Sequence, residues 1–289
     1  MKIVTHDSSF HTDDICAVAT LLLVLGDAEV IRSRDTEVYK TADYLVDTGM
    51  KYDPAHHFFD HHQPEGAGVR KNGIPYASFG LVWKEFGEQL AGGKKEAELF
   101  DKRLVQAVDA HDNGVTTVEY KFEGVEEYHL GDFFNSFVDS RDPDHIYATF
   151  MYLVGIAKDL ITREIAITKR LVVDHDKIAS FYNESDDKRL VVMSEDLRGW
   201  KDFIRGKPEV LYVIYPRPDG KWTLATASIH DNHYTPRKRL PVGWAGLTDE
   251  ELQKSSGVSD ATFCHRNLFM CAARSKEGAI KLAEIALNA

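Results

Sequence analysis

Histidine and aspartate are concentrated in four short stretches in the first half of the chain. The densest is Phe59-Asp60-His61-His62, which follows a short apolar run and precedes Gln63-Pro64. One carboxylate and two imidazoles in succession are an unusual concentration of metal-binding side chains. Alternation along a strand would place Asp60 and His62 on one face and His61 on the other. One imidazole would then bind a metal ion, while the neighbouring side chains hold that imidazole in place or contact a substrate.

The other three stretches also lie where a predicted strand or helix ends. The first runs from His6 to Asp14, the second ends the apolar run 44–46 with Asp47, and the third precedes Asn113-Gly114. Each has a purely structural alternative: Thr12 or Asp13 would cap a helix, and the remaining aspartates would form turns. Four such stretches together favour a metal site. Its candidate ligands are His6, His11, Asp13, Asp47, His61, Asp109 and Asp112.

Carboxylates and imidazoles without thiolates favour Mn²⁺, with Mg²⁺, Co²⁺ or Zn²⁺ as alternatives. The ligands are too many for one ion, but they suit two ions about 3.5–4 Å apart that share a carboxylate. Such a pair generates hydroxide at neutral pH and neutralises charge on a phosphoryl group. The sequence contains neither a glycine-rich nucleotide cradle nor a Gly-x-Ser-x-Gly elbow.

The elements that must position these residues alternate between strand and helix. The sequence predicts strands at 2–5, 28–31, 44–49 and 58–59, and helices at 15–25, 76–90 and 97–110. This order predicts a mostly parallel α/β sheet, in which ligands gather at the carboxyl ends of the strands.

A long helical stretch, 144–182, follows, which residues 172–174 would interrupt if it breaks at all. Residues 183–188 are the best linker candidate, and strands are expected at 190–193, 210–215, 222–227 and 263–265, with a closing helix at 276–289. We therefore expect two domains. Residues 1–185 would form the catalytic domain with its connecting helix, and residues 186–289 a smaller α+β substrate-binding domain.

Charge limits the classes of partner. Lys+Arg number 35 and Asp+Glu 46, a net charge of −11 with histidines neutral, so no global positive field attracts nucleic acid. Local basic groups in the second half would have to bind phosphate, unless they are ordinary solvated surface. Such groups occur at Lys201, Arg205 and Lys207, and again at 237–239.

The chain predicts a cytoplasmic protein that does not enter a membrane. It turns polar directly after its first residues, which does not fit a signal peptide. Its longest apolar run, 17–25, is far shorter than the roughly 20 residues that span a bilayer. Cys16, Cys264 and Cys271 are expected to be buried and unpaired in a reducing compartment.

The order of these motifs resembles the DHH phosphoesterase superfamily, which includes RecJ-type exonucleases, nano-RNA phosphatases and manganese pyrophosphatases. More closely, the chain resembles the melanocyte-proliferating-gene (Myg) family, described as 3′–5′ RNA exonucleases. In the first half the resemblance rests on residues 5–6, 10–13, 46–47, 60–63 and 108–114. In the second half it rests on 239–241 (Arg-Leu-Pro), 243–247 (Gly-Trp-Ala-Gly-Leu), 263–265 (Phe-Cys-His) and 276–279 (Lys-Glu-Gly-Ala).

The resemblance implies a role for each site residue. His6, His11 and Asp13 would hold one edge of a metal pair, Asp47 would bridge the ions and His61 would bind one of them. His62 would face the substrate, with Asp60 orienting its neighbours. The superfamily usually has aspartate where this chain has His11. Asp112 fits the superfamily's Asp-Thr-Gly pattern and is favoured over Asp109, which lies one helical turn earlier.

Arg239 and His265 lie in matching stretches outside the metal motifs and are predicted to bind phosphate oxygens. The alternative is that Arg239 pairs with a surface carboxylate and that His265 is a core residue. The expected activity is a two-metal phosphodiesterase that releases 5′-mononucleotides from single-stranded RNA or short oligonucleotides. A small-phosphoester or pyrophosphate hydrolase and a non-catalytic nucleotide-binding module are the alternatives. The oligomeric state is not fixed by the sequence.

Overall fold

The structure, a computed structural model, describes residues 1–229 and 235–289. These residues form two compact units, Met1–Lys169 and Arg170–Ala289, each with a five-stranded sheet. The division falls inside helix α7 (Pro143–Glu184), which runs without the interruption considered at 172–174. The predicted boundary at 185/186 assigns all of α7 to the first domain, and it stays a proposal.

The sheet of the first unit is mostly parallel, as the alternating pattern predicted. Its neighbouring strands β2, β1, β3 and β5 are parallel, and β4 pairs antiparallel with β5 at the edge. The edge strand was not predicted because it has two residues and no alternation to recognise. In spatial order the strands are β2 (Glu29–Arg32), β1 (Lys2–Thr5), β3 (Tyr44–Val46), β5 (Phe58–Phe59) and β4 (Tyr52–Asp53).

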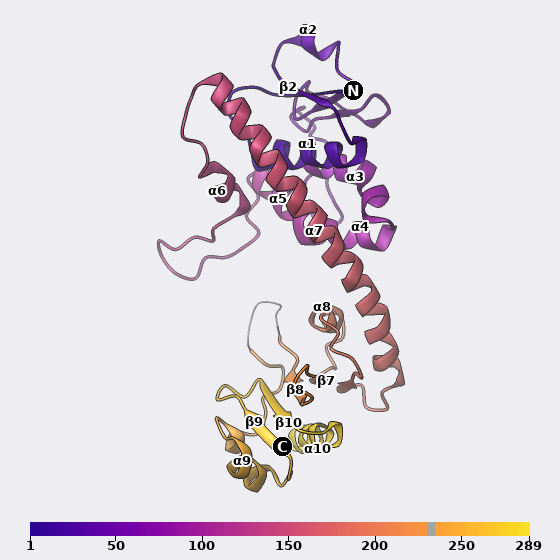
Figure 1. The fold of residues 1–289 in the computed structure, drawn as a ribbon, viewed down its shortest axis with the longest axis vertical. Helices are drawn as coiled ribbons and strands as arrows, with labels where there is room; N and C mark the ends of the chain where they lie inside the picture. Colours follow the sequence, from indigo (N-terminus) through magenta and orange to yellow (C-terminus); the bar gives the residue numbers. More distant parts are fainter. Residues whose placement is uncertain (230–234) are drawn as a thin grey trace. The chain divides into compact units, whose positions relative to one another are not determined.

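Helices α1 (Thr12–Leu25) and α3 (Ser78–Ala91) lie side by side in this unit (Figure 1). The core that they share is built from apolar faces at helical spacing, with Ile15, Leu21 and Phe79 fully buried. The remaining helical segments are α2 (Thr36–Tyr39), a 3₁₀ turn (Pro54–His56), α4 (Lys94–Phe100), a π-helical turn (Asp101–Val105), α5 (Gln106–Asp112) and α6 (Leu130–Asn135).

The second unit has a mixed sheet with an apolar cluster on each face. Strands β6 and β7 are parallel and the other pairs are antiparallel, including the predicted hairpin at 217–220. In spatial order the strands are β6 (Leu190–Val192), β7 (Tyr212–Pro216), β8 (Trp222–Thr226), β10 (Met270–Ala273) and β9 (Ala261–Cys264). The helices are α8 (Trp200–Ile204), a 3₁₀ turn (Val242–Trp244), α9 (Asp249–Ser256) and α10 (Lys276–Asn288).

All three cysteines are buried and free, as expected. Within residues 1–229 and 235–289, none of the helices combines the length and apolar character that crossing a membrane requires.

Candidate metal centre

Three parallel strands deliver polar side chains to one edge of the first sheet. His6 follows β1, Asp47 follows β3 and Asp60 follows β5. The carboxyl ends of parallel strands lie at the same edge, so these side chains meet although they are far apart in the sequence. Asp47 has a backbone φ of 52°, in the left-handed region, which ends its strand sharply and turns the carboxylate toward the edge.

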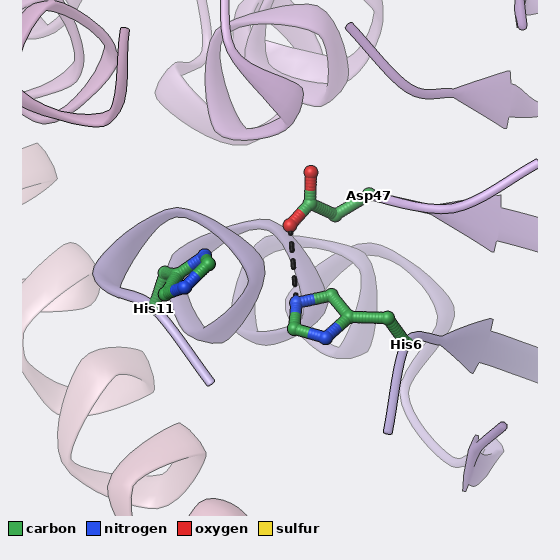
Figure 2. Close-up of side chains that lie close together, drawn as sticks. All are labelled: His6, His11 and Asp47. Atoms are coloured by element: carbon green, nitrogen blue, oxygen red, sulfur yellow. Dashed lines mark ion pairs between the residues drawn. The ribbon is translucent and has the colours of Figure 1, made fainter. Parts of the chain in front are cut away.

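One group of ligand atoms comes from His6, His11 and Asp47 (Figure 2). The Nε2 atom of His6 lies 3.2 Å from Asp47 Oδ2 and 3.3 Å from Asp14 Oδ2. His11 directly precedes α1, and its ring centroid is 5.5 Å from that of His6. His6 and Asp47 are buried, whereas His11 is exposed, so the group opens to solvent on the His11 side.

A second group uses the other oxygen of Asp47. Its Oδ1 lies 3.4 Å from His61 Nε2 and 3.5 Å from His62 Nδ1, and it accepts a hydrogen bond of 3.0 Å from Ser78 Oγ. Asp47 therefore faces two groups of imidazoles with its two oxygens. This is the arrangement expected of a carboxylate shared by two ions.

A third group joins Asp13, His61 and Asp112, whose nearest ligand atoms lie within 4.8 Å of one another. His61 Nε2 is 3.1 Å from Asp112 Oδ2, and the other Asp112 oxygen is 3.9 Å from His11 Nδ1. Asp112, at the end of α5, thus approaches both His61 and His11.

The expected capping role of Thr12 or Asp13 at α1 was wrong. The N-cap residue is His11, whose backbone N–H donates to Asp14 Oδ1 at 2.8 Å. Asp13 instead accepts the backbone N–H groups of Ser78 and Phe79, at 3.0 and 2.7 Å. The first amides of α3 have no hydrogen-bond partner within the helix, and they lie at the positive end of the helix dipole. This end of the helix therefore stabilises the buried Asp13 carboxylate.

The structure does not bring Asp109 into any of the three groups among the described residues. Asp109 is buried, pairs with Arg70 Nη1 at 2.7 Å and accepts the Gly80 N–H at 3.0 Å. A Cβ atom on residue 80 would lie 1.8 Å from Asp109 Oδ2, so only glycine fits there. Asp112, one turn later on α5, is the carboxylate that reaches the cluster.

Asp60 binds the backbone and the ring of the residues around it. Its two oxygens accept the Met50 N–H at 2.6 Å, the His62 N–H at 3.1 Å and His62 Nδ1 at 2.7 Å. The expected placement of His61 and His62 on opposite faces was wrong, because β5 ends at Phe59 and the alternation of a strand ends with it. Both imidazoles approach Asp47 instead.

The donor set fits divalent cations. Four buried atoms in the cluster make no hydrogen bond to any part of the chain that the structure describes: His6 Nε2, Asp14 Oδ2, Asp47 Oδ2 and His61 Nε2. A buried polar atom without a partner is costly, and here imidazole nitrogens and carboxylate oxygens converge, as they do around a metal ion. A bound cation would supply the partners that these side chains lack.

The charges of these groups are strongly coupled. Burial lowers the pKa of His61, but the Asp112 and Asp47 carboxylates outweigh it and raise that pKa to about 11. Burial raises the pKa of Asp14 to about 7, although the His6 charge opposes it. Burial also acts to raise the pKa of Asp47, yet the neighbouring His6 and His61 imidazoles outweigh burial and hold that pKa well below its usual range. The carboxylates thus favour the protonated form of His61 at the place where a cation would bind.

Two residues that the sequence did not single out contact this centre. Asp14 places an oxygen beside His6, and the only signal was its position next to Asp13 in a pair of carboxylates. Ser78 binds Asp47 through its hydroxyl and Asp13 through its N–H. No sequence signal marks Ser78, because a serine at the start of an apolar helix is ordinary.

Two cavities adjoin the cluster. The first, of about 610 Å³, is named here the β3 cavity; it is lined by His6, His62, Arg34, Tyr39 and Met50, among others. The second, of about 320 Å³, is named the α6 cavity; it is lined by residues of α5 and α6 together with Thr12. His11 lines both cavities, so the cluster lies between two spaces that a substrate can enter.

The two residues predicted to bind substrate belong to the second unit. The Arg239 side chain is exposed and makes no ion pair within the residues that the structure describes, so the alternative of a surface carboxylate partner is not seen there. His265 is also half-buried, not a core residue. Its Nδ1 accepts the Asn267 N–H at 3.0 Å, and its ring centroid lies 4.1 Å from that of Phe269.

Comparisons with known proteins agree with the motifs. The MYG1 exonuclease family model, described as "Uncharacterised protein family (UPF0160)", matches residues 2–287. The MYG1 exonuclease of Homo sapiens is 29% identical over 325 aligned residues, which cover 99% of this chain and 85% of that protein. The MYG1 protein of Dictyostelium discoideum is 26% identical over 323 aligned residues, covering 100% of this chain and 97% of that protein.

Among solved structures, RecJ from Thermus thermophilus in complex with Mn²⁺ is similar at 13% identity and a TM-score of 0.29. The match covers 100% of this chain and 52% of that chain. These values are too low to establish a shared fold.

Proposed function

The chain belongs to the MYG1 exonuclease family, and from this premise we propose that it is a metal-dependent exonuclease. Its substrate would be single-stranded RNA or a short oligonucleotide, from which it releases 5′-mononucleotides in the 3′–5′ direction. Relatives named MYG1 exonuclease support the nuclease class. The observation that carries the proposal is Asp47, which presents its two oxygens to two separate groups of imidazole ligands.

Two divalent ions, with Mn²⁺ favoured over Mg²⁺, Co²⁺ or Zn²⁺, would be shared between these groups. His6, His11 and Asp47 would hold one ion; the other would be held by Asp13, His61 and Asp112, with Asp47 between them. When bound, such ions supply a nucleophile at neutral pH and positive charge against the phosphoryl oxygens. With His11 in place of the superfamily's aspartate, this chain has one carboxylate fewer at the site.

His62 and Asp60 would act on the substrate side. Asp60 accepts from His62 Nδ1 and so fixes the ring, leaving Nε2 for a substrate oxygen. The hydrogen bond to Asp60 raises the pKa of His62, although burial opposes it, so this contact favours the protonated ring. His62 is half-exposed and lines the β3 cavity, where it would donate that proton toward the leaving oxygen.

The second domain, residues 186–289, would select the substrate. A chain with a net charge of −11 needs local cations to bind a polyanion. Arg239, free of an ion pair in the described part of the chain, and the open Nε2 of His265 suit phosphate oxygens.

The test is hydrolysis of 5′-labelled RNA, 5′-labelled DNA and pyrophosphate by the purified protein with Mn²⁺. We expect a ladder of RNA products shortened one nucleotide at a time, abolished by a chelator. Hydrolysis of pyrophosphate alone would support the small-phosphoester hydrolase instead. Tight nucleotide binding without turnover, in protein that holds two ions per chain, would support the binding module.

A further inference from the structure

The α6 cavity differs in character from the metal cluster beside it. Its walls are largely apolar, with Leu104, Val108 and Leu130 from three helical segments. Two imidazoles, His111 and His129, also line it, with ring centroids 5.3 Å apart and planes inclined by 50°. Within the described chain, neither ring belongs to a group of candidate metal ligands.

The cavity shares residues with the cluster. His11 and Asp112 line it, and both belong to the candidate metal groups. The side-chain atoms His11 Nδ1 and Asp112 Oδ1 are 3.9 Å apart. A group in the α6 cavity would therefore lie next to a phosphate bound at the cluster.

The wall that carries His129 packs against Thr12 and His111. The His129 N–H donates to Asp132 Oδ2 at 2.7 Å, which fixes the start of α6. Gly131 allows α6 to approach closely: a Cβ there would lie 3.2 Å from Thr12 Oγ1 and 3.5 Å from His111 Cε1. These contacts of Asp132 and Gly131 place the start of α6, and with it His129, beside His111.

We propose that the α6 cavity binds the nucleobase of the terminal nucleotide and that His111 and His129 contact the face of that base. The proposal rests on the proposed function of the adjacent centre. Unpaired bases are recognised by stacking on aromatic and histidine rings, and apolar walls favour a base over a bare phosphate or ribose. The volume is at the low end of ligand sites, roughly 300–1,000 Å³, so it suits one nucleoside and limits the product to one nucleotide.

The test compares the binding of AMP with that of ribose 5-phosphate, by calorimetry in the presence of Mn²⁺. The two probes share the phosphate and differ in the base. We expect AMP to bind on the order of tenfold to a hundredfold more tightly, the range that stacking of one base provides. In His129→Ala this preference should disappear, while ribose 5-phosphate affinity and Mn²⁺ content stay unchanged. His56→Ala, which removes an exposed imidazole outside both cavities, should retain it.

A second variant fills the space and keeps both rings. Ala107 lines the cavity, so Ala107→Phe should remove the AMP preference even if His129→Ala folds poorly. Equal affinities of the wild type for the two probes, or a preserved preference in Ala107→Phe with normal Mn²⁺ content, would overturn the base site. An AMP preference without cleavage of any oligonucleotide would support the base site and refute the proposed exonuclease activity.

Discussion

Asp47→Asn gives the sharpest test of the shared carboxylate. Asp47 has a φ of 52°, and asparagine is one of the few residues besides glycine that adopts this conformation readily. The substitution is nearly isosteric and keeps an oxygen for the Ser78 hydroxyl, which lies at 3.0 Å. It removes one negative charge and little else, so the fold should survive.

The electrostatic loss is large on the scale of binding. The His6 and His61 nitrogens approach the Asp47 oxygens to 3.2 and 3.4 Å. A unit charge pair at about 4 Å is worth about 4 kcal/mol at an effective dielectric constant near 20. This corresponds to roughly a thousandfold in a binding constant, and a divalent ion increases the effect. We expect Mn²⁺ affinity to fall by about three orders of magnitude, and turnover with it.

Mn²⁺ titration by calorimetry and metal analysis after dialysis measure the affinity, and circular dichroism checks the fold. Asp53→Asn is the matched control, because Asp53 lies on the same sheet and pairs with Lys51 and His56, outside the cluster. A folded Asp47→Asn protein that binds Mn²⁺ as tightly as the wild type would refute the shared role.

Four further predictions follow from the contacts around the centre. Asp112→Asn should lower Mn²⁺ content, whereas Asp109→Asn should keep both ions and lower the free energy of unfolding by about 3 kcal/mol, as breaking a buried ion pair does. Metal analysis and urea denaturation distinguish the two variants, and the opposite pattern would exchange the roles of the two aspartates. Gly80→Ala places a Cβ 1.8 Å from Asp109 Oδ2, so the denaturation midpoint should drop as overpacking costs about 2 kcal/mol or more; an unchanged midpoint would contradict that contact. The pKa of His61 is raised to about 11, so its ring is protonated at neutral pH before a cation binds. Mn²⁺ binding should therefore release protons and tighten as pH rises, and equal binding enthalpies in buffers of different ionisation enthalpy would exclude proton release. Arg239→Ala should weaken oligonucleotide binding, measured by fluorescence anisotropy, with Mn²⁺ content and hydrolysis of a small diester little changed; equal losses on both substrates would assign the residue to folding.

The sequence predicted that these polar side chains would meet, because each follows a strand of a parallel sheet. His6, Asp47 and Asp60 each come directly after an apolar run, and a parallel sheet places such residues at one edge. The family was predictable from the same motifs, and the match to residues 2–287 confirms it.

The contacts made across the chain were not predictable. Asp13 looked like the cap of its own helix, but its partners are amides 65 and 66 residues later. Asp109 and Asp112 are both acidic and one turn apart, and only the position of Arg70 separates an ion-paired carboxylate from a candidate ligand. The pattern of a single segment has no information about which distant segment supplies the partner. Short elements such as β4 and α6 were missed for a related reason, since they are too short for periodicity.

The first turn of α3 gives the centre a folding requirement. Its amides bind Asp13, 65 residues before Ser78, and Asp109, 29 residues after Gly80. Contacts of such sequence separation form late, because the intervening chain must first be closed. A growing polypeptide would thus expose His6, Asp47 and His61 before α3 docks, yet lack the buried geometry that brings them together. Metal capture would then be coupled to the final docking step, and amide hydrogen exchange at Ser78, Phe79 and Gly80 would slow as the ions bind.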